Sequence, residues 1–306
     1  MMLTRRRFAK LGLLASASLA IARPSQAISE LGFEFFVLGD WGQRSEGQRR
    51  VARAMKQIAS MSPPRFVIST GDNFYPRGVA DEDDSLWTEL FEKVYDSDEL
   101  KCPWYSVLGN HDYKGNEDAQ ITYAQRNPRW VMPSRYYQHV EPMAGPLQAE
   151  FFFIDTTPIV SDYPKLWTKW MDRADPDLQL DWLEKSLRNS STNVKIVIGH
   201  HPIFSSGPHG ASPELVKRVK PLLEKYGVRA YFNGHDHNLQ HHVNSGIHYF
   251  VCGSAAQVKA PNSSTGTSFW AAQLGLIRAD VSPSELKVEF IDESAQVIHA
   301  ARISIT

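Results

Sequence analysis

This chain contains five short polar motifs, and each motif directly follows an apolar run that predicts a buried strand. In chain order the motifs are GDWG at Asp40, GDNFY from Asp72 to Tyr75, GNHD from Asn110 to Asp112, VIGHH with His200, and GHDH from His235 to His237. The strand-like runs that precede them are 33–39, 66–70, 104–108, 195–199 and 229–233. Loops that follow successive strands of an α/β sheet meet at one edge of that sheet. The five motifs are therefore predicted to form one site.

The remaining pattern predicts an α/β fold with mixed sheets. Helices are expected at 45–60, at 83–94 and from about residue 212 onward, and further strands at 151–155, 247–253, 269–279, 285–292 and 297–305. Several of the later strands alternate in hydrophobicity and are joined by short turns, so the C-terminal part is predicted to be antiparallel. Because the motifs come from both halves of the chain, we expect a single domain over 28–306, a mixed β-sandwich flanked by helices.

The first 27 residues carry the pattern of an export signal. Residues 4–10 are basic and resemble a twin-arginine signal, 11–22 are weakly apolar, and 25–27 are small residues at the spacing that a signal peptidase reads. The apolar stretch is too short for a stable membrane anchor. We expect cleavage after Ala27 and transport by the twin-arginine translocation machinery of a bacterium, to a periplasmic or secreted location.

Charge and cysteine content narrow the range of partners. Removal of the signal takes away five of the 33 Lys and Arg and leaves 28 against 34 Asp and Glu, a net charge of about −6. Nucleic-acid binding depends on clustered basic residues, so no nucleic-acid partner is expected. Cys102 and Cys252 could either pair in an oxidising compartment or remain as two buried thiols, and the sequence leaves both open.

The side chains of the motifs divide into two predicted metal sites that share one carboxylate. The first comprises Asp40, Asp72, Tyr75 and His237, and the second comprises Asp72, Asn110, His200 and His235. Two cations about 3.5–4 Å apart can hold the attacking and departing oxygens of a displacement, as in two-metal phosphatases. A tyrosine hydroxyl has a pKa near 10 and must lose its proton to bind a metal. We therefore expect Fe(III) beside Tyr75, and Fe(II), Zn or Mn at the second site.

These motifs closely resemble those of the purple acid phosphatases, the small tartrate-resistant type, within the calcineurin-like metallophosphoesterase superfamily. GDWG, GDNFYPRGV, CPWYSVLGNHDY, VIGHHPIF and NGHDHNLQ stand in the order of that family, and the tyrosine of GDNFY is its specific mark. The resemblance implies a four-layer αββα sandwich, the same seven metal ligands, and hydrolysis of phosphomonoesters at acidic to neutral pH. It also implies that His111 and His209 are catalytic and, with Asn110, bind the substrate.

The expected mechanism is in-line attack of a metal-bound hydroxide on phosphorus, with a histidine protonating the leaving alkoxide. One alternative is a phosphodiesterase or nucleotide hydrolase of the same superfamily, enzymes that usually lack the tyrosine. The other is a non-catalytic periplasmic metal or phosphate binder, which would need ligands but no proton donor such as His111.

Several other residues are assigned less specific roles. Asp112 is expected to hold its loop or to orient a ligand histidine. His201 is expected to line the cleft, whereas His241 and His242 are expected to be ordinary surface histidines. The segment 156–176 is expected to be either a lid over the cleft or a long loop that packs against the rest of the domain.

Overall fold

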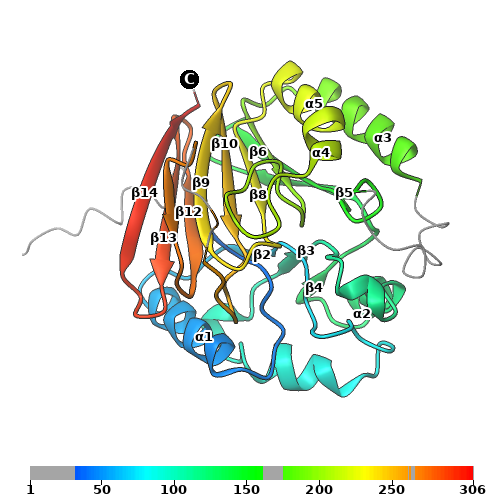
Figure 1. Cartoon of the computed structure of the whole chain (residues 1–306). Coiled ribbons are helices and arrows are strands. Elements are labelled where there is room, and N and C mark those ends of the chain that lie inside the picture. The colour runs from blue at the N-terminus through cyan, green and yellow to red at the C-terminus, as the bar shows by residue number, and fades with distance from the viewer. Residues whose placement is uncertain (1–31, 161–174, 261, 263–265, 306) are drawn as a thin grey trace, which may run out of the picture.

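The structure is a computed structural model that describes residues 32–160, 175–260, 262 and 266–305 (Figure 1). The expected export signal at 1–27 and most of the segment 156–176 lie outside the described residues. Within the described part of the chain, no helix has both the length and the apolar character needed to cross a membrane.

The described strands form two mixed sheets of seven strands each: one half of sheet A is parallel and the other antiparallel, whereas sheet B has a parallel centre with antiparallel strands on both sides. Sheet A has the order β14 (Val297–Ser304), β13 (Glu285–Asp292), β12 (Gly275–Val281), β1 (Phe33–Leu38), β2 (Phe66–Ser69), β3 (Trp104–Ser106) and β4 (Trp130–Val131). Sheet B has the order β11 (Phe269–Ala271), β9 (Leu239–Asn244), β10 (Ile247–Cys252), β8 (Ala230–Asn233), β7 (Val194–Ile198), β6 (Gln148–Phe153) and β5 (Tyr137–Pro142).

Helices cover the outer faces of both sheets (Figure 1). On the side of sheet A lie α1 (Glu46–Ala59), a π-helical turn η1 (Trp87–Glu92), the short turns η2 (Asp98–Leu100) and η3 (Asp112–Lys114), and α2 (Asp118–Ala124). Outside sheet B lie α3 (Pro176–Asn189), α4 (Pro213–Arg218) and α5 (Lys220–Lys225). The result is the predicted four-layer αββα arrangement.

Aromatic side chains join the two sheets in the middle of the sandwich. The rings of Phe35 and Phe66 of sheet A stack with centroids 5.3 Å apart. Phe151 of sheet B packs edge-on against both of them, at 5.4 and 5.3 Å. Such contacts add to the free energy gained from burying the rings. A second apolar cluster, which includes Leu183 and Leu223, lies between sheet B and helices α3–α5.

The structure confirms most of the predicted strands and the antiparallel C-terminal part, in which β12, β13 and β14 pair in antiparallel register. It differs at 269–279, which contributes β11 to sheet B and β12 to sheet A. Strands β4, β5 and β9 and helices α2 and α3 were not predicted. Cys102 and Cys252 are both unpaired, and only Cys252 is fully buried.

The prediction that His241 and His242 lie on the surface is wrong. Their side chains are only 5% and 6% exposed, because β9 lies between β10 and β11. His241 lies 3.0 Å from His299 and 2.9 Å from His248 through its two ring nitrogens. Histidine partners thus satisfy a polar side chain that the strand buries.

Candidate metal centre

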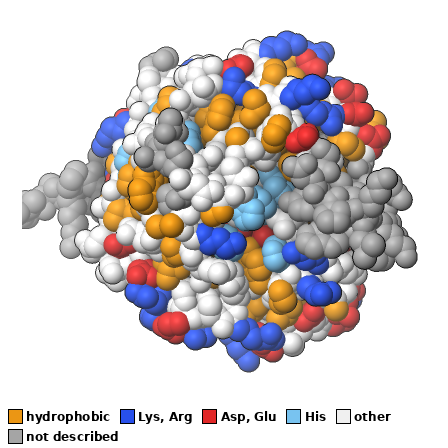
Figure 2. Space-filling view, viewed as in Figure 1, with side chains coloured by type: hydrophobic (Ala, Val, Ile, Leu, Met, Phe, Trp, Pro, Cys, Tyr) orange, Lys and Arg blue, Asp and Glu red, His pale blue; other side chains and the backbone are white. Residues whose placement is uncertain are grey.

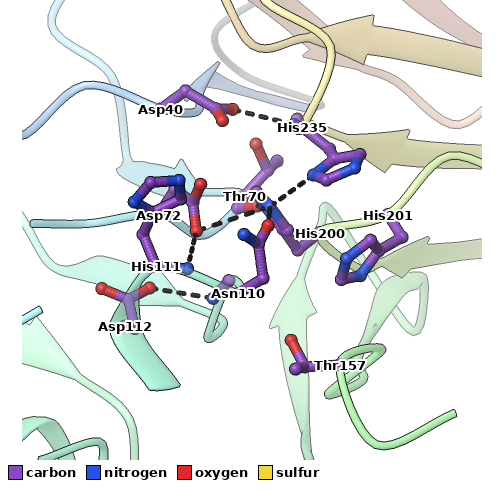
Figure 3. A network of polar contacts seen from close by, with 12 residues as sticks. Asp40, Thr70, Asp72, Asn110, His111, Asp112, Thr157, His200, His201 and His235 are labelled. Carbon is purple, nitrogen blue, oxygen red and sulfur yellow. Dashed lines mark hydrogen bonds and ion pairs between the residues drawn. The ribbon is translucent and has the colours of Figure 1, made fainter. Parts of the chain in front are cut away.

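The carboxyl ends of parallel strands from both sheets meet at one place in the molecule. In sheet A, β1, β2 and β3 run parallel, and in sheet B, β6, β7 and β8 do so. The residues that follow these strands point toward one another (Figure 3): Asp40, Asp72, Asn110, His200 and His235. The sheets are also tied together here, since the backbone N–H of His235 donates to Asp40 Oδ2 at 2.9 Å. The juxtaposition that the motif spacing predicts is therefore present.

Three of the predicted ligands adopt strained backbone conformations. Asp40, Asp72 and His235 have φ angles of 58°, 50° and 70°, in the left-handed region that side chains with a Cβ rarely occupy. Such conformations cost of the order of 1–3 kcal/mol each and cluster at functional sites. Close packing adds to the constraint, because a Cβ on Gly109 would lie 2.2 Å from Asp72 Oδ1. The motif glycine is thus needed for the carboxylate of Asp72 to lie where it does.

The first cluster of ligands surrounds the hydroxyl of Tyr75. Its oxygen lies 2.9 Å from Asp40 Oδ1, 2.7 Å from Asp72 Oδ2 and 3.2 Å from His237 Nε2. Asp40 and Asp72 are almost fully buried, at 0% and 2% exposure. A phenol has one proton, so it cannot donate to two carboxylates at once. Two buried carboxylates with so few donors fit a bound cation, which would balance their charge.

The protonation of Tyr75 depends on that cation. Burial, followed by the charges of Asp40 and Asp72, raises the pKa of Tyr75 well above its ordinary value. Burial also acts to raise the pKa of Asp40, but hydrogen bonding to His237 and the charges of His200 and His237 lower it overall. Asp40 is therefore ionised, whereas a Tyr75 phenolate requires a strongly charged cation beside it.

The second cluster surrounds Nε2 of His200. This atom lies 3.1 Å from Asn110 Oδ1, 3.2 Å from His235 Nδ1 and 3.5 Å from Asp72 Oδ1. The other ring nitrogen, Nδ1, lies 2.9 Å from the carbonyl oxygen of Thr70. A carbonyl can only accept, so in the neutral ring Nδ1 carries the proton and Nε2 presents its lone pair to the cluster.

The local field in this cluster also favours a positive charge. Burial acts to lower the pKa of His200, but the carboxylates of Asp72 and Asp40 outweigh it and raise that pKa. Asp72 gives one carboxylate oxygen to each cluster, Oδ2 to the first and Oδ1 to the second. The seven predicted ligands thus form two adjoining clusters with a shared carboxylate, a donor set that fits two cations.

His111 lies beside the first cluster and His209 beside the second. The ring of His111 packs against Tyr75 with centroids 4.4 Å apart, and its backbone N–H donates to Asp72 Oδ1 at 2.7 Å. The ring of His209 packs against His235 at 4.3 Å. Its backbone N–H donates to Asp236 Oδ1 at 3.1 Å, which holds the loop in place. Each histidine therefore contacts a predicted ligand of one cluster.

Asp112 holds the loops of the site, one of the two roles expected for it. Its carboxylate accepts hydrogen bonds from the backbone N–H groups of Gly109 at 2.8 Å and Asn73 at 3.1 Å. Burial, followed by the charge of Asp72, raises the pKa of Asp112 to about 7. Asp112 thus holds the backbone next to Asp72 and Asn110 in place.

Two contributors, Thr156 and Lys114, carry no signal in the sequence, and a third, His201 of the VIGHH motif, was expected to line the cleft. His201 is buried, and one of its ring nitrogens lies within 4.8 Å of nitrogens of His200 and His235. The hydroxyl of Thr156 lies 2.8 Å from His201 Nδ1 and accepts from the backbone N–H of His200 at 3.2 Å. Lys114 places its ammonium 3.1 Å from His111 Nε2. The contacts of Thr156 and Lys114 depend on the folded loops and not on any motif.

Comparisons with known proteins agree with this geometry. The family model for calcineurin-like phosphoesterase matches residues 33–239. Purple acid phosphatase 3 of Arabidopsis thaliana is 37% identical over 283 residues, which cover 87% of this chain and 76% of the relative. Human tartrate-resistant acid phosphatase type 5 is 34% identical over 292 residues, which cover 88% of this chain and 90% of the relative.

Solved structures show the same fold. A Plasmodium structure described as GAP50, the anchor in the inner membrane complex, superposes with a TM-score of 0.81 at 27% identity, over 90% of both chains. A purple acid phosphatase from yellow lupin seeds superposes with a TM-score of 0.66 at 17% identity, over 89% of this chain and 54% of that one. The second likeness concerns the fold alone.

Proposed function

Because this chain belongs to the calcineurin-like phosphoesterase family, as a member of its purple acid phosphatase branch, we propose that it is a dinuclear acid phosphatase that hydrolyses phosphomonoesters. The observation that carries the dinuclear assignment is the position of Asp72, whose two carboxylate oxygens face two different ligand clusters. Tyr75 at the centre of one cluster supports ferric iron as one of the two cations.

Each cluster would hold one cation. Fe(III) would be bound by Asp40, Asp72, Tyr75 and His237, and Fe(II), Zn or Mn by Asp72, Asn110, His200 and His235. When bound, such cations lower the pKa of coordinated water to about 7 and offset the charge of phosphate oxygens. Both effects are those required to hydrolyse a phosphate ester near neutral pH.

The surrounding side chains orient the substrate and move protons. His111 Nδ1 lies 2.7 Å from the carbonyl oxygen of Pro76, so Nδ1 carries a proton and the ring is held in one orientation. In the doubly protonated ring, Nε2 of His111 carries a second proton that can pass to the leaving alkoxide, and because burial lowers the pKa of His111, acidic pH favours this form. Asn110 and His209 would hold the phosphate group from the side of the second cluster. Direct hydrolysis is expected, since no motif of the sequence presents a Ser, Cys or Asp nucleophile.

Steady-state turnover of p-nitrophenyl phosphate and bis-p-nitrophenyl phosphate tests this function. We expect the metal-loaded wild type to hydrolyse the monoester much faster than the diester. Faster cleavage of the diester would instead identify a phosphodiesterase. Binding of phosphate without turnover of either ester would identify a non-catalytic protein, a possibility that the similarity to a Plasmodium protein described as an anchor makes worth testing.

We also propose export by the twin-arginine route, which rests on the basic residues at 4–10. This route carries folded proteins, which suits a site that must acquire its cations before transport. We expect the double substitution Arg5→Lys and Arg6→Lys to leave a folded, metal-loaded precursor in the cytoplasm. Cell fractionation with metal analysis measures this outcome, and normal export of the double variant would exclude the twin-arginine route.

A further inference from the structure

A lysine lies on a loop that is hydrogen-bonded to one of the predicted metal ligands. The backbone N–H of Lys259 donates to the carbonyl oxygen of His237 at 2.7 Å. The carbonyl oxygen of Lys259 accepts from Asn238 Nδ2 at 3.2 Å. Both bonds use the backbone of Lys259, so they fix the position of the residue and leave its side chain available for another contact.

The same loop is also attached to the loop that carries His209. Three positions after Lys259, the backbone N–H of Asn262 donates to the carbonyl oxygen of Ser206 at 2.8 Å. Charge effects agree with this placement: burial lowers the pKa of His209, the charge of Asp236 raises it, and the charge of Lys259 lowers it. Because the effect of a charge falls with distance, the ammonium of Lys259 lies in the neighbourhood of His209.

The ammonium of Lys259 is not engaged by the residues around it. In the described part of the chain no hydrogen bond or ion pair involves this group, and the side chain is half-buried. Asp236 is fully buried and already accepts from Ser205 Oγ and from the backbone N–H of His209. Lys and Arg side chains lie beside the exposed histidines on the face shown in Figure 2. An unpaired ammonium offers three N–H donors to an anion.

We propose that Lys259 determines substrate preference by binding a second anionic group, a carboxylate or a phosphate, in the alcohol part of a phosphomonoester. The proposal rests on the proposed phosphatase function. The two cations, Asn110 and His209 would hold the phosphate that reacts, so the alcohol part extends from the buried ligands toward the surface. His209 is exposed and Lys259 half-buried, which places both at the outer end of the site. A cation there favours alcohols that carry a negative charge over neutral ones.

Two small phosphomonoesters form a matched pair of probes, because 3-phosphoglycerate has a carboxylate where glycerol 3-phosphate has a neutral hydroxymethyl group. We expect Lys259→Met to lower kcat/KM for 3-phosphoglycerate by about 3- to 10-fold, between the effects of an exposed ion pair and a buried charged hydrogen bond. The loss should appear mainly in KM, since the contact is remote from the reacting phosphorus. The value for glycerol 3-phosphate should stay nearly unchanged. Lys259→Arg should keep the preference of the wild type, and Lys259→Glu should reverse it.

Calorimetric binding of 4-phosphonobutyrate and butylphosphonate to the metal-loaded protein provides a readout without turnover, because neither compound has an ester bond. We expect Lys259→Met to weaken binding of 4-phosphonobutyrate by a similar factor and to leave binding of butylphosphonate unchanged. The control Lys56→Met, which replaces an exposed lysine in the last turn of α1, should change neither.

Three outcomes would each overturn the proposal: equal losses on both esters, unchanged binding of 4-phosphonobutyrate, or loss of a cation from Lys259→Met. A wild type that binds the phosphonates but turns over neither ester would refute the phosphatase function. The binding comparison would then still decide the role of Lys259.

Discussion

Asp72→Ala is expected to abolish turnover and to remove both cations from the protein. Its Oδ2 atom lies 2.7 Å from the hydroxyl of Tyr75 and its Oδ1 atom 3.5 Å from His200 Nε2, so the substitution removes one ligand from each cluster. The buried ligands that remain would then carry too little charge to hold two cations. Elemental analysis of the purified variant and its kcat/KM for p-nitrophenyl phosphate measure the two effects.

The exposed carboxylate Asp98, which pairs only with Lys101 among the contacts of the described residues, offers a matched control. Asp98→Ala should keep both cations and full turnover. Retention of both cations by a folded Asp72→Ala variant would show that this carboxylate does not bridge the two sites.

His111→Ala is expected to lower kcat for alkyl phosphates by about 10² to 10⁴, the usual contribution of a positioned acid or base. Because His111 belongs to neither ligand cluster, the variant should keep both cations and any visible absorption of the iron site. The loss should shrink for esters with acidic leaving groups, which need less protonation. His209→Ala should show a smaller loss of the same kind.

His139, whose ring stacks on Tyr105 away from the clusters, provides the control for loss of an imidazole. His139→Ala should leave kcat unchanged. Full activity of His111→Ala on alkyl phosphates, or loss of a cation from it, would show that His111 is not the proton donor.

The sequence indicates the ligand clusters well because each motif follows a strand, and strand ends converge. Asp40, Asp72 and Asn110 come from adjacent parallel strands of one sheet, so their proximity follows from the strand pattern alone. His200 and His235 come from the other sheet, and their proximity to the first three was predicted from the same rule, although the strand pattern did not show that two sheets contribute to the site. The positive φ angles of Asp40, Asp72 and His235 are invisible in the sequence.

The remaining features depend on contacts between distant segments. The stretch 269–279 has one continuous apolar pattern, yet its two ends pair with different sheets. The division between the two strands depends on how the two sheets pack together. Strand β9 was missed because Gln240, His241 and His242 read as exposed polar residues, although His248 and His299 satisfy His241 in the interior and Gln240 satisfies His242. The position of Lys114 beside His111 likewise depends on the turn that joins them.

The visible absorption spectrum of the oxidised, iron-containing protein tests the account most directly, when wild type is compared with Tyr75→Phe. If the Tyr75 phenolate binds ferric iron, the wild type shows a broad charge-transfer band and Tyr75→Phe lacks it, while both keep the iron content of the same preparation. A colourless oxidised wild type that contains iron, or a band that survives in Tyr75→Phe, would remove Tyr75 from the metal centre and contradict the proposed dinuclear site.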